Sequence, residues 1–283
     1  MNWHFLTIGV GTKNFERAAL RLGKEAARSK SFASLIIETN KSLSSQHIDF
    51  NLTHSKFIVE NAATGYGNYL WKPYLVNYWL NKIPDGDGLL YLDAGCTLNL
   101  KSENALKKWN EYFSFAEKNG SLVTQLNNGE FGIDNLSEEA WTTPELINEI
   151  GLSDVGAKSN QIQSGIIFLA KNDLNLFVLN EWQKFSTFDD YSFLKTRQFK
   201  SEFGISRTNR WEQSIFSCLV KKHKLHSIPD ETYFYPDWHK KGKNFPIWAI
   251  RNRSGVSVVR FSVKDIPAHT YRLTKRVIRK LSS

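Results

Sequence analysis

The feature that most constrains the fold of this 283-residue chain is a short apolar run that ends abruptly on an acid. Residues 89–92 have the length of a buried strand, follow an Asp-Gly turn and lead directly into Asp93-Ala94-Gly95. Open α/β sheets bind ligands at the carboxyl ends of their strands. The run therefore predicts a sheet with Asp93 at its ligand-binding edge, although an Asp that only caps a turn fits this short pattern equally well.

A helix is predicted directly before this strand. Leu75, Tyr78 and Trp79 recur at the i, i+3, i+4 spacing of one helix face. Pro73 is tolerated only in the first turn of a helix, so the helix begins near Lys72.

The start of the chain predicts a strand, a helix and a second strand, at residues 5–10, 15–30 and 34–38. Such a unit forms a parallel pair with a right-handed crossover. The helix is amphipathic, with Ala18, Leu22 and Ala26 on its apolar face and Arg17, Arg21, Lys24 and Arg28 on the other. Gly9-Val10-Gly11 lacks the third glycine of a dinucleotide-binding fingerprint, which argues against a Rossmann dehydrogenase.

Further elements are expected along the rest of the chain. Residues 39–64 appear irregular or weakly helical. We expect a helix at 104–118, strands at 121–126 and 166–169, and a helix that ends near Val220. Residues 127–158 are polar, with a helix opening at Thr143-Pro144, and are the expected acceptor-facing insertion. The predicted class is α/β: one domain, residues 1–268, with a mostly parallel central sheet flanked by helices.

Composition restricts the function classes. A hydrophobic content of 41% is ample for a core, which argues against disorder. The sequence shows no apolar run of about 18 residues and no signal-peptide pattern, and its two cysteines form neither a disulfide framework nor a zinc motif. We therefore expect a cytoplasmic protein.

The formal net charge of +9 favours anionic partners such as nucleotides, phospholipid surfaces or nucleic acid. Part of it lies in the last residues, at Arg272, Lys275, Arg276, Arg279 and Lys280. Residues 269–283 are predicted to form a basic amphipathic helix, which either lies on the anionic inner face of a membrane or packs on the domain. No nucleic-acid-binding motif is recognised, so no nucleic-acid partner is expected.

Three motifs resemble one enzyme family. Tyr91-Leu92-Asp93-Ala94-Gly95 is similar to the Tyr-Leu-Asp-Ala-Asp strand end of GT-A glycosyltransferases, particularly the glycogenin-like and lipopolysaccharide-galactosyltransferase family. Gln163-Ser164-Gly165 resembles the family's Asn-Ser-Gly, which touches the sugar. Trp211-Glu212-Gln213-Ser214 resembles its Asp-Gln-Asp helix start. The resemblance implies a GT-A-like fold, with Lys72 facing the nucleotide sugar.

A weaker resemblance follows near the end of the domain. His239 to Trp248 is similar to the family's His-x-x-Gly-x-x-Lys-Pro-Trp with one residue added, which implies that His239 binds metal and Lys243 holds the pyrophosphate. Asp93 would be the other metal ligand. The second acid of the family motif is Gly95 here, so a divalent cation, Mn²⁺ or Mg²⁺, has one of its two expected carboxylates.

The implied function is transfer of a sugar from a nucleotide-diphosphate sugar, with UDP favoured, to a glycan or lipid-linked saccharide, in cell-surface polysaccharide synthesis and with retained configuration. Catalytic roles fall to Asp93, Glu212 and Gln213. Donor contacts are assigned to Thr12, Lys72, Asp93, Gly95, Gln163, Ser164, Gly165, Lys243, Arg251 and Arg253. The two arginines are included because arginines can neutralise a diphosphate through bidentate pairs. Two alternatives are a catalytically silent relative that binds a sugar or nucleotide, and a basic nucleic-acid-binding protein.

Overall fold

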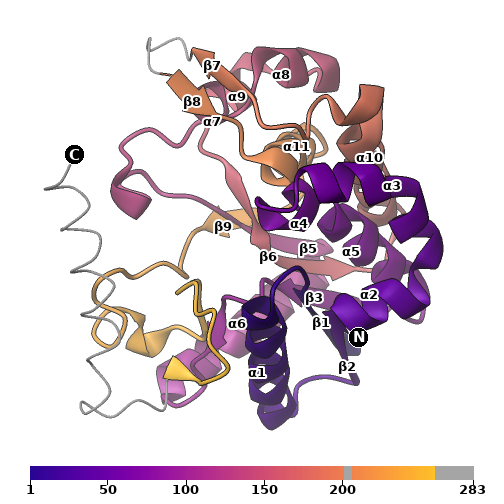
Figure 1. The fold of residues 1–283 in the computed structure, drawn as a ribbon. Helices are drawn as coiled ribbons and strands as arrows, with labels where there is room; N and C mark the ends of the chain where they lie inside the picture. Colours follow the sequence, from indigo (N-terminus) through magenta and orange to yellow (C-terminus); the bar gives the residue numbers. More distant parts are fainter. Residues whose placement is uncertain (201–205, 259–283) are drawn as a thin grey trace, which may run out of the picture.

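A central six-stranded sheet organises the fold, and helices pack on both of its faces (Figure 1). The structure is a computed structural model that describes residues 1–200 and 206–258. The strands of this sheet are β1 (Trp3–Gly9), β2 (Ser34–Thr39), β3 (Gly88–Leu92), β5 (Ser121–Gln125), β6 (Ile162–Ala170) and β9 (Ser227–Pro229). Their order across the sheet is β2-β1-β3-β6-β5-β9. The predicted α/β class is confirmed.

All strands of this sheet run in one direction except β6. β1 pairs in parallel with β2 and β3, and β9 pairs in parallel with β5. β6 is antiparallel to both of its neighbours, β3 and β5. This reversal places the beginning of β6 beside the carboxyl end of β3, where the Asp93 amide donates to the Gly165 carbonyl at 2.8 Å. Residues 163–165, expected as a turn before the strand, therefore lie within it.

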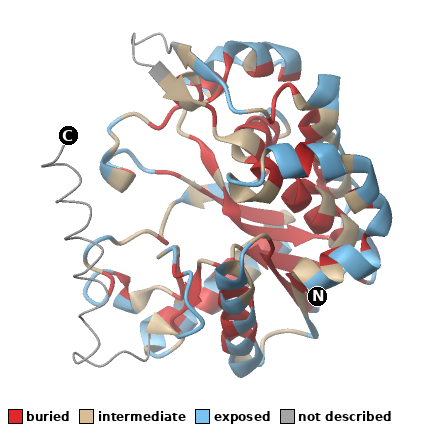
Figure 2. Ribbon diagram, in the orientation of Figure 1, coloured by how far each residue is buried: buried red, intermediate tan, exposed pale blue. Residues whose placement is uncertain are grey.

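The helices form a layer on each face of the sheet. They are α1 (Lys13–Ser29), α2 (Asn40–Gln46), α3 (Ile48–Glu60), α4 (Gly65–Asn68), α5 (Trp71–Lys82), α6 (Glu103–Asn119), α7 (Glu138–Trp141), α8 (Pro144–Ile150), α9 (Asp154–Lys158), α10 (Asp173–Tyr191) and α11 (Trp211–Lys222), with short 3₁₀ turns η1 (Glu130–Gly132) and η2 (Gly242–Asn244). α1 and α6 pack on one face, while α5 and α11 pack on the other with α10 against them. Buried residues fill the sheet and the helix sides turned toward it (Figure 2).

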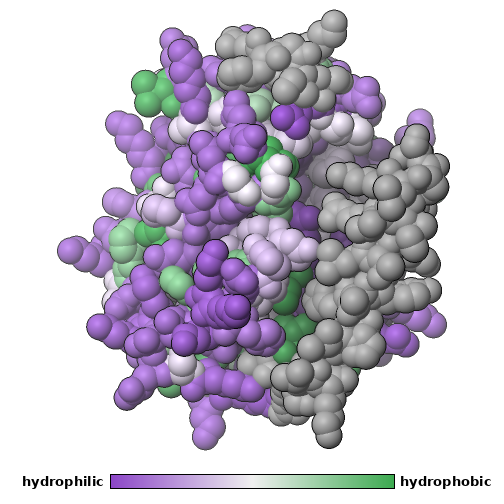
Figure 3. Space-filling model, turned by 90° about the vertical axis from the view of Figure 1, so that its left-hand side faces the viewer, coloured by the Kyte–Doolittle hydropathy of each residue, from purple (hydrophilic) through white to green (hydrophobic). Residues whose placement is uncertain are grey.

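Two short pairs of strands complete the described structure. β4 (Thr97–Leu98) pairs with β10 (Ile247–Trp248), and β7 (Gln198–Lys200) pairs with β8 (Ser206–Thr208). The first pair returns the end of the described chain to the region that follows Asp93. On the face shown in Figure 3, hydrophilic residues cover most of the described surface and a smaller group of hydrophobic residues lies near the middle.

Of the two alternatives for residues 39–64, the helical one holds, because most of this segment forms α2 and α3. A capping box starts α2: the Thr39 hydroxyl accepts from the Ser42 amide, and the Ser42 hydroxyl accepts from the Thr39 amide. α3 buries Phe50, Phe57 and Ile58, at the i, i+7, i+8 spacing of one face. Its mixed polar composition hides this pattern in the sequence.

The prediction that Arg21 lies on the exposed face of α1 was wrong, because its side chain is buried. The guanidinium donates to the carbonyl oxygens of Ala94 (2.8 Å) and Cys96 (2.7 Å) and to the Thr97 hydroxyl (2.9 Å). It also pairs with Glu25 at 3.1 Å. A guanidinium carries five donors, enough to satisfy a turn whose carbonyls point into the protein. Arg21 therefore fixes the turn that follows Asp93.

Some predictions lie outside the described residues. The basic helix of residues 269–283 and the domain boundary after residue 268 are among them. Among the helices of residues 1–200 and 206–258, none combines the length and the apolar character needed to span a bilayer.

Replacing Arg21 should destabilise the fold strongly. In Arg21→Met, Glu25 keeps a buried charge and the carbonyls of Ala94 and Cys96 lose their donors, so we expect a loss of about 3–5 kcal/mol in the free energy of unfolding. Urea denaturation measures it. Lys24→Met, on the exposed side of the same helix, is the control and should change stability by less than about 0.5 kcal/mol. A loss below about 1 kcal/mol for Arg21→Met would contradict the assigned role.

Candidate functional site

A cavity of about 590 Å³ opens at the carboxyl ends of β1 and β3 and the beginning of β6. Segments far apart in the sequence form its wall, among them the start of α5, the start of α11 and residues 249–253. Most of the predicted site residues line it: Lys72, Asp93, Gly95, Gln163, Ser164, Gly165, Glu212, Gln213, Arg251 and Arg253. The fold therefore brings together motifs that the sequence only places in order along the chain.

Lys72 connects three of these motifs. Its ammonium nitrogen lies 2.7 Å from Glu212 Oε1 and 3.2 Å from Asp93 Oδ1. It also donates to the Ser164 hydroxyl at 3.2 Å, and that hydroxyl donates to Glu212 Oε1 at 2.8 Å. The side chains of Lys72 and Glu212 are each 4% exposed, whereas that of Asp93 is 45% exposed. Asp93 is the most exposed of these three charged side chains in the cavity wall.

The electrostatics of this group favour a charged lysine. Burial lowers the pKa of Lys72, but the negative charges of Asp93 and Glu212 raise it by more than burial lowers it. The pKa of Lys72 therefore lies above its ordinary value. Burial raises the pKa of Glu212, and the charge of Lys72 opposes part of that rise. Lys72 was predicted to face the nucleotide sugar, but its ammonium is directed at two carboxylates.

The Asp93 carboxylate is held in one orientation. The Tyr91 hydroxyl donates to Asp93 Oδ1 at 2.5 Å, the oxygen that also contacts Lys72. A side chain at Gly165 would place its Cβ 2.7 Å from Asp93 Oδ2, so glycine leaves the space that the carboxylate occupies. Gly165 was predicted to contact the donor; in the structure this position also accommodates Asp93.

Gly95 lies against the returning end of the domain. A Cβ at Gly95 would stand 3.1 Å from the Arg251 Cα, and the Asn252 amide donates to the Gly95 carbonyl at 2.8 Å. A side chain at position 95 would therefore require the Arg251 backbone to shift by a few tenths of an ångström. The close approach carries Arg251 and Arg253 to the cavity, where their guanidinium groups lie over the rings of Phe131 (4.7 Å) and Phe15 (5.0 Å).

The two glutamines of the predicted site are anchored by other side chains. Gln163 Nε2 donates to the Thr124 hydroxyl at 2.6 Å and to Asp230 Oδ1 at 3.0 Å. Gln213 Nε2 donates to Gln161 Oε1 at 3.0 Å. Both amide groups are thus oriented before any ligand binds.

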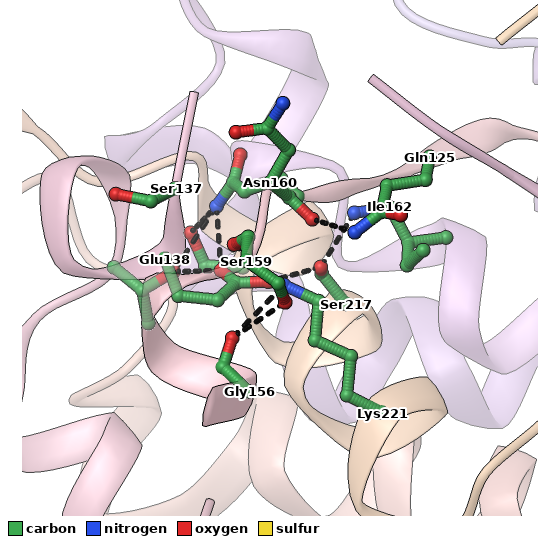
Figure 4. A network of polar contacts seen from close by, with 12 residues as sticks. Gln125, Ser137, Glu138, Gly156, Ser159, Asn160, Ile162, Ser217 and Lys221 are labelled. Atoms are coloured by element: carbon green, nitrogen blue, oxygen red, sulfur yellow. Dashed lines mark hydrogen bonds and ion pairs between the residues drawn. The ribbon is translucent and has the colours of Figure 1, made fainter. Parts of the chain in front are cut away.

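A buried polar network behind Gln213 ties α7 to α11 (Figure 4). Its centre is Glu138, which pairs with Lys221 at 2.7 Å and accepts a hydrogen bond from the Ser217 hydroxyl. Glu138 also accepts from Gln161 Nε2 at 3.0 Å, which links the network to Gln213. Because Glu138 is fully buried, its pairing with Lys221 makes this a rigid support.

Sequence reasoning missed Arg210, Trp141 and Phe131, which also line the cavity. Arg210 precedes the first turn of α11, and its guanidinium lies 4.2 Å from the centre of the Trp141 ring. The available signal was a basic residue at a helix start, where backbone amides and the helix dipole favour anions. Trp141 lies in the segment that we expected to face the acceptor, but the sequence did not single it out.

Three predicted site residues are not among those that line the cavity: Thr12, His239 and Lys243. Thr12 precedes α1, and its side chain is exposed. His239 packs edge-on against Trp248, with 5.3 Å between ring centres. Lys243 lies in η2, and its carbonyl accepts from Asn99 and Ser102. These three residues, predicted to contact the donor, a metal and the pyrophosphate, therefore lie outside the wall of the cavity that contains Asp93.

The protein side chains at Asp93 do not fit a divalent cation on their own. Within residues 1–200 and 206–258, no group of three or more His, Cys, Asp or Glu side chains gathers in a metal-binding arrangement. Asp93 contributes a single carboxylate, and Tyr91 and Lys72 already contact its Oδ1. Metal sites built from hard oxygen ligands need more donors than this.

A second pair of acids, Glu130 and Asp230, lies next to Gln163. Both are buried, and Glu130 Oε2 and Asp230 Oδ2 have no hydrogen-bond partner among the described groups. A proton shared between the two carboxyl groups would satisfy both oxygens. Burial and the charge of Asp230 raise the pKa of Glu130 to about 8, and burial raises the pKa of Asp230. At neutral pH the pair therefore holds a proton.

Three solved structures similar to this chain are glycosyltransferases. One is involved in the glycosylation of the major capsid of PBCV-1 (10% identity, 96% of this chain and 100% of that chain covered, TM-score 0.48). The others are mouse xyloside xylosyltransferase 1 in its apo form (12%, 88% and 97%, 0.45) and the galactosyltransferase LgtC with donor and acceptor sugar analogues (12%, 88% and 86%, 0.41). No protein-family model and no curated protein matches the sequence. With TM-scores below 0.5 and identities this low, we base no conclusion about activity on these likenesses.

The shared proton makes stability depend on pH. The raised pKa of Glu130 means that the folded protein binds a proton that the unfolded chain releases above about pH 4.5. Stability should therefore fall as pH rises from about 5 to 9, as the folded protein releases that proton. Glu130→Gln should lose less stability over that range in thermal unfolding, whereas Glu145→Gln, on an exposed position of α8, should match the wild type. Equal pH profiles for Glu130→Gln and the wild type would rule out the shared proton.

Proposed function

We propose that this chain is a glycosyltransferase that uses a nucleotide-diphosphate sugar and transfers its sugar to a hydroxyl of a glycan or lipid-linked saccharide. The observation that carries the proposal is the division of charge in the cavity. Its inner wall holds the acids Asp93 and Glu212 around Lys72, and Arg210, Arg251 and Arg253 also line it. Within the described residues, none of these arginines has a carboxylate at ion-pair distance.

This division suits the two ends of the donor. The diphosphate gains negative charge as it leaves, so fixed cations lower the barrier to its departure. Arg251 and Arg253 are placed for this because their backbone passes beside Gly95, and guanidinium groups bind phosphate oxygens in a bidentate manner. UDP is the nucleotide that we favour. Asp93, half-exposed beside Gly95, would accept hydrogen bonds from sugar or ribose hydroxyls.

The anomeric carbon gains positive charge as the bond to the diphosphate breaks and the acceptor oxygen approaches. Glu212 is the buried carboxylate that would stabilise this charge, with Gln213 next to it in the cavity wall. Its Oε1 accepts from both Lys72 and Ser164, which fixes its position and makes this oxygen a poor proton acceptor. The proton of the acceptor hydroxyl would pass to Asp93 or to the departing phosphate. This assignment favours electrostatic stabilisation by Glu212 over the general-base role.

Other parts of the proposal rest on sequence alone. They are the cytoplasmic location, the contact of residues 269–283 with an anionic membrane, and a role in cell-surface polysaccharide synthesis. Binding of a divalent cation also stays a prediction. If one binds, it would screen the diphosphate charge, with Asp93 as the predicted ligand that lines the cavity.

The direct test is titration with UDP-glucose, UDP-galactose, UDP-xylose and UDP-N-acetylglucosamine, with and without Mn²⁺, followed by melting temperature and by release of UDP. A donor should raise the melting temperature by mass action and be hydrolysed slowly or transferred. Binding without turnover under either condition would instead indicate a catalytically silent sugar-binding protein. Salt-sensitive binding of an oligonucleotide, with no response to any nucleotide sugar, would overturn the proposal.

Asp93→Asn should abolish transfer and leave the fold intact. The amide keeps the shape of the side chain but removes the charge that faces the cavity, so we expect turnover of the donor to fall by at least about 100-fold. Thermal unfolding and turnover are measured together. Asp134→Asn, in an exposed loop position, is the matched control and should retain wild-type turnover. Retained turnover in Asp93→Asn would contradict the assignment of Asp93.

A further inference from the structure

We propose that the cavity has a second anion-binding subsite at Arg210 and Trp141, and that the acceptor saccharide it holds carries a phosphate or a carboxylate. The interpretation of this subsite as an acceptor site rests on the function proposed above. The binding of an anionic sugar can be tested without that function.

Arg210 is the main observation. Its guanidinium lies over the Trp141 ring at 4.2 Å and lines the cavity. Within residues 1–200 and 206–258, it has no ion pair with any carboxylate. Burying a charge without a partner costs free energy that the folded protein must offset elsewhere. An anionic ligand would remove that cost when it binds.

Like charges nearby increase the cost. Arg207 also lies over the Trp141 ring, at 4.7 Å, and its Nε is buried without a hydrogen-bond partner among the residues that the structure describes. Arg251 lies over the ring of Phe131, at 4.7 Å. Burial and the charges of Arg251 and Arg207 lower the pKa of Arg210 to about 10, although Glu138 and Glu130 act in the opposite direction. Glu138 is already paired with Lys221, so it does not neutralise the cluster.

The aromatic partner is fixed in place. The Trp141 ring nitrogen donates to the Asn135 carbonyl at 2.8 Å, and the Trp141 carbonyl accepts from the Ser214 hydroxyl at 3.0 Å. The Glu138–Lys221 pair holds the start of α7 against α11, the helix that Arg210 precedes (Figure 4). A rigid indole offers an apolar surface to a sugar ring, and a guanidinium beside it binds an attached anion in a bidentate manner.

The cluster comes from other segments of the chain than most of the proposed donor contacts. Arg253 lies over Phe15 of α1, beyond the end of β1, next to the Asp93 edge. Trp141 and Phe131 both come from the polar insertion after β5, on the other side of β6. A single diphosphate at Gly95 would pair with Arg253 and with Arg251, which also lies over Phe131 and so borders both groups, and this leaves Arg210 for a different anion. A neutral acceptor would leave that charge without a partner.

The probes are glucose, glucuronate and glucose 6-phosphate, titrated into the protein without nucleotide and followed by melting temperature and calorimetry. Inorganic phosphate is a fourth probe, which measures the anion without a sugar. Glucuronate, glucose 6-phosphate or both should bind at least about tenfold more tightly than glucose, since a charge-assisted hydrogen bond contributes this much. Phosphate should bind more weakly than the better of the two anionic sugars. Which anionic sugar binds identifies the phosphate or the carboxylate as the recognised group.

Arg210→Gln should reduce the affinity for the anionic sugars by about tenfold or more and bring it close to that for glucose. Arg210→Lys should fall between, because it keeps the charge and loses the planar fork. Lys222→Gln, which removes an exposed charge from the other end of α11, is the matched control and should bind as the wild type does. Equal binding of glucose and both anionic sugars, or unchanged binding in Arg210→Gln, would overturn the subsite.

The melting temperature without ligand separates a binding role from a structural one. If Arg210 is a half-buried cation without an anionic partner, Arg210→Gln should melt at a higher temperature than the wild type. If its contact with Trp141 mainly supports the fold, the variant should melt lower, and that result would also count against the subsite. A protein that binds anionic sugars but no nucleotide sugar would keep the subsite and reject the proposed transferase.

Discussion

The ammonium of Lys72, buried between the carboxylates of Asp93 and Glu212, is the interaction on which the rest of the site depends. It joins the first turn of α5, the end of β3 and the first turn of α11, with Ser164 of β6 completing the contact. Without this cation two negative charges would lie close together, one of them with almost no access to water. Arg21 has a similar role in the turn that follows Asp93, where it donates to the carbonyl oxygens of Ala94 and Cys96.

The pairing of Lys72 decides how the cavity can treat a ligand. Because Lys72 is committed to two acids, the cations left to bind an anion are arginines that enter from the end of the domain and from the start of α11. Acids at one place and unpaired arginines at another match a ligand with a sugar at one end and a diphosphate at the other. A second acid at position 95 would crowd the Arg251 backbone, which passes close to Gly95.

The sequence was sufficient for local elements and for motifs that follow strand ends. The helix that starts near Lys72, the strand before Asp93 and the buried face of α11 were all predictable from periodicity and turn residues. The contact between Lys72 and Glu212 was not, because it depends on how distant segments pack. The reversed direction of β6, the burial of Arg21 and the exposed side of Asp93 depend on the sheet order. Arg210 and Trp141 were missed since neither forms a motif by itself, and the spacing of His239 and Lys243 suggested a convergence that the described structure does not show.

The most direct test of the central claim is a double-mutant cycle of Lys72→Met and Glu212→Gln, measured as the free energy of unfolding in urea. A buried ion pair predicts that either single change is strongly destabilising and that the double variant is more stable than the sum of the two losses implies, with a coupling of at least about 1.5 kcal/mol. Losses that add to within about 0.5 kcal/mol would show that Lys72 and Glu212 do not interact, and the division of charge proposed for this cavity would be wrong.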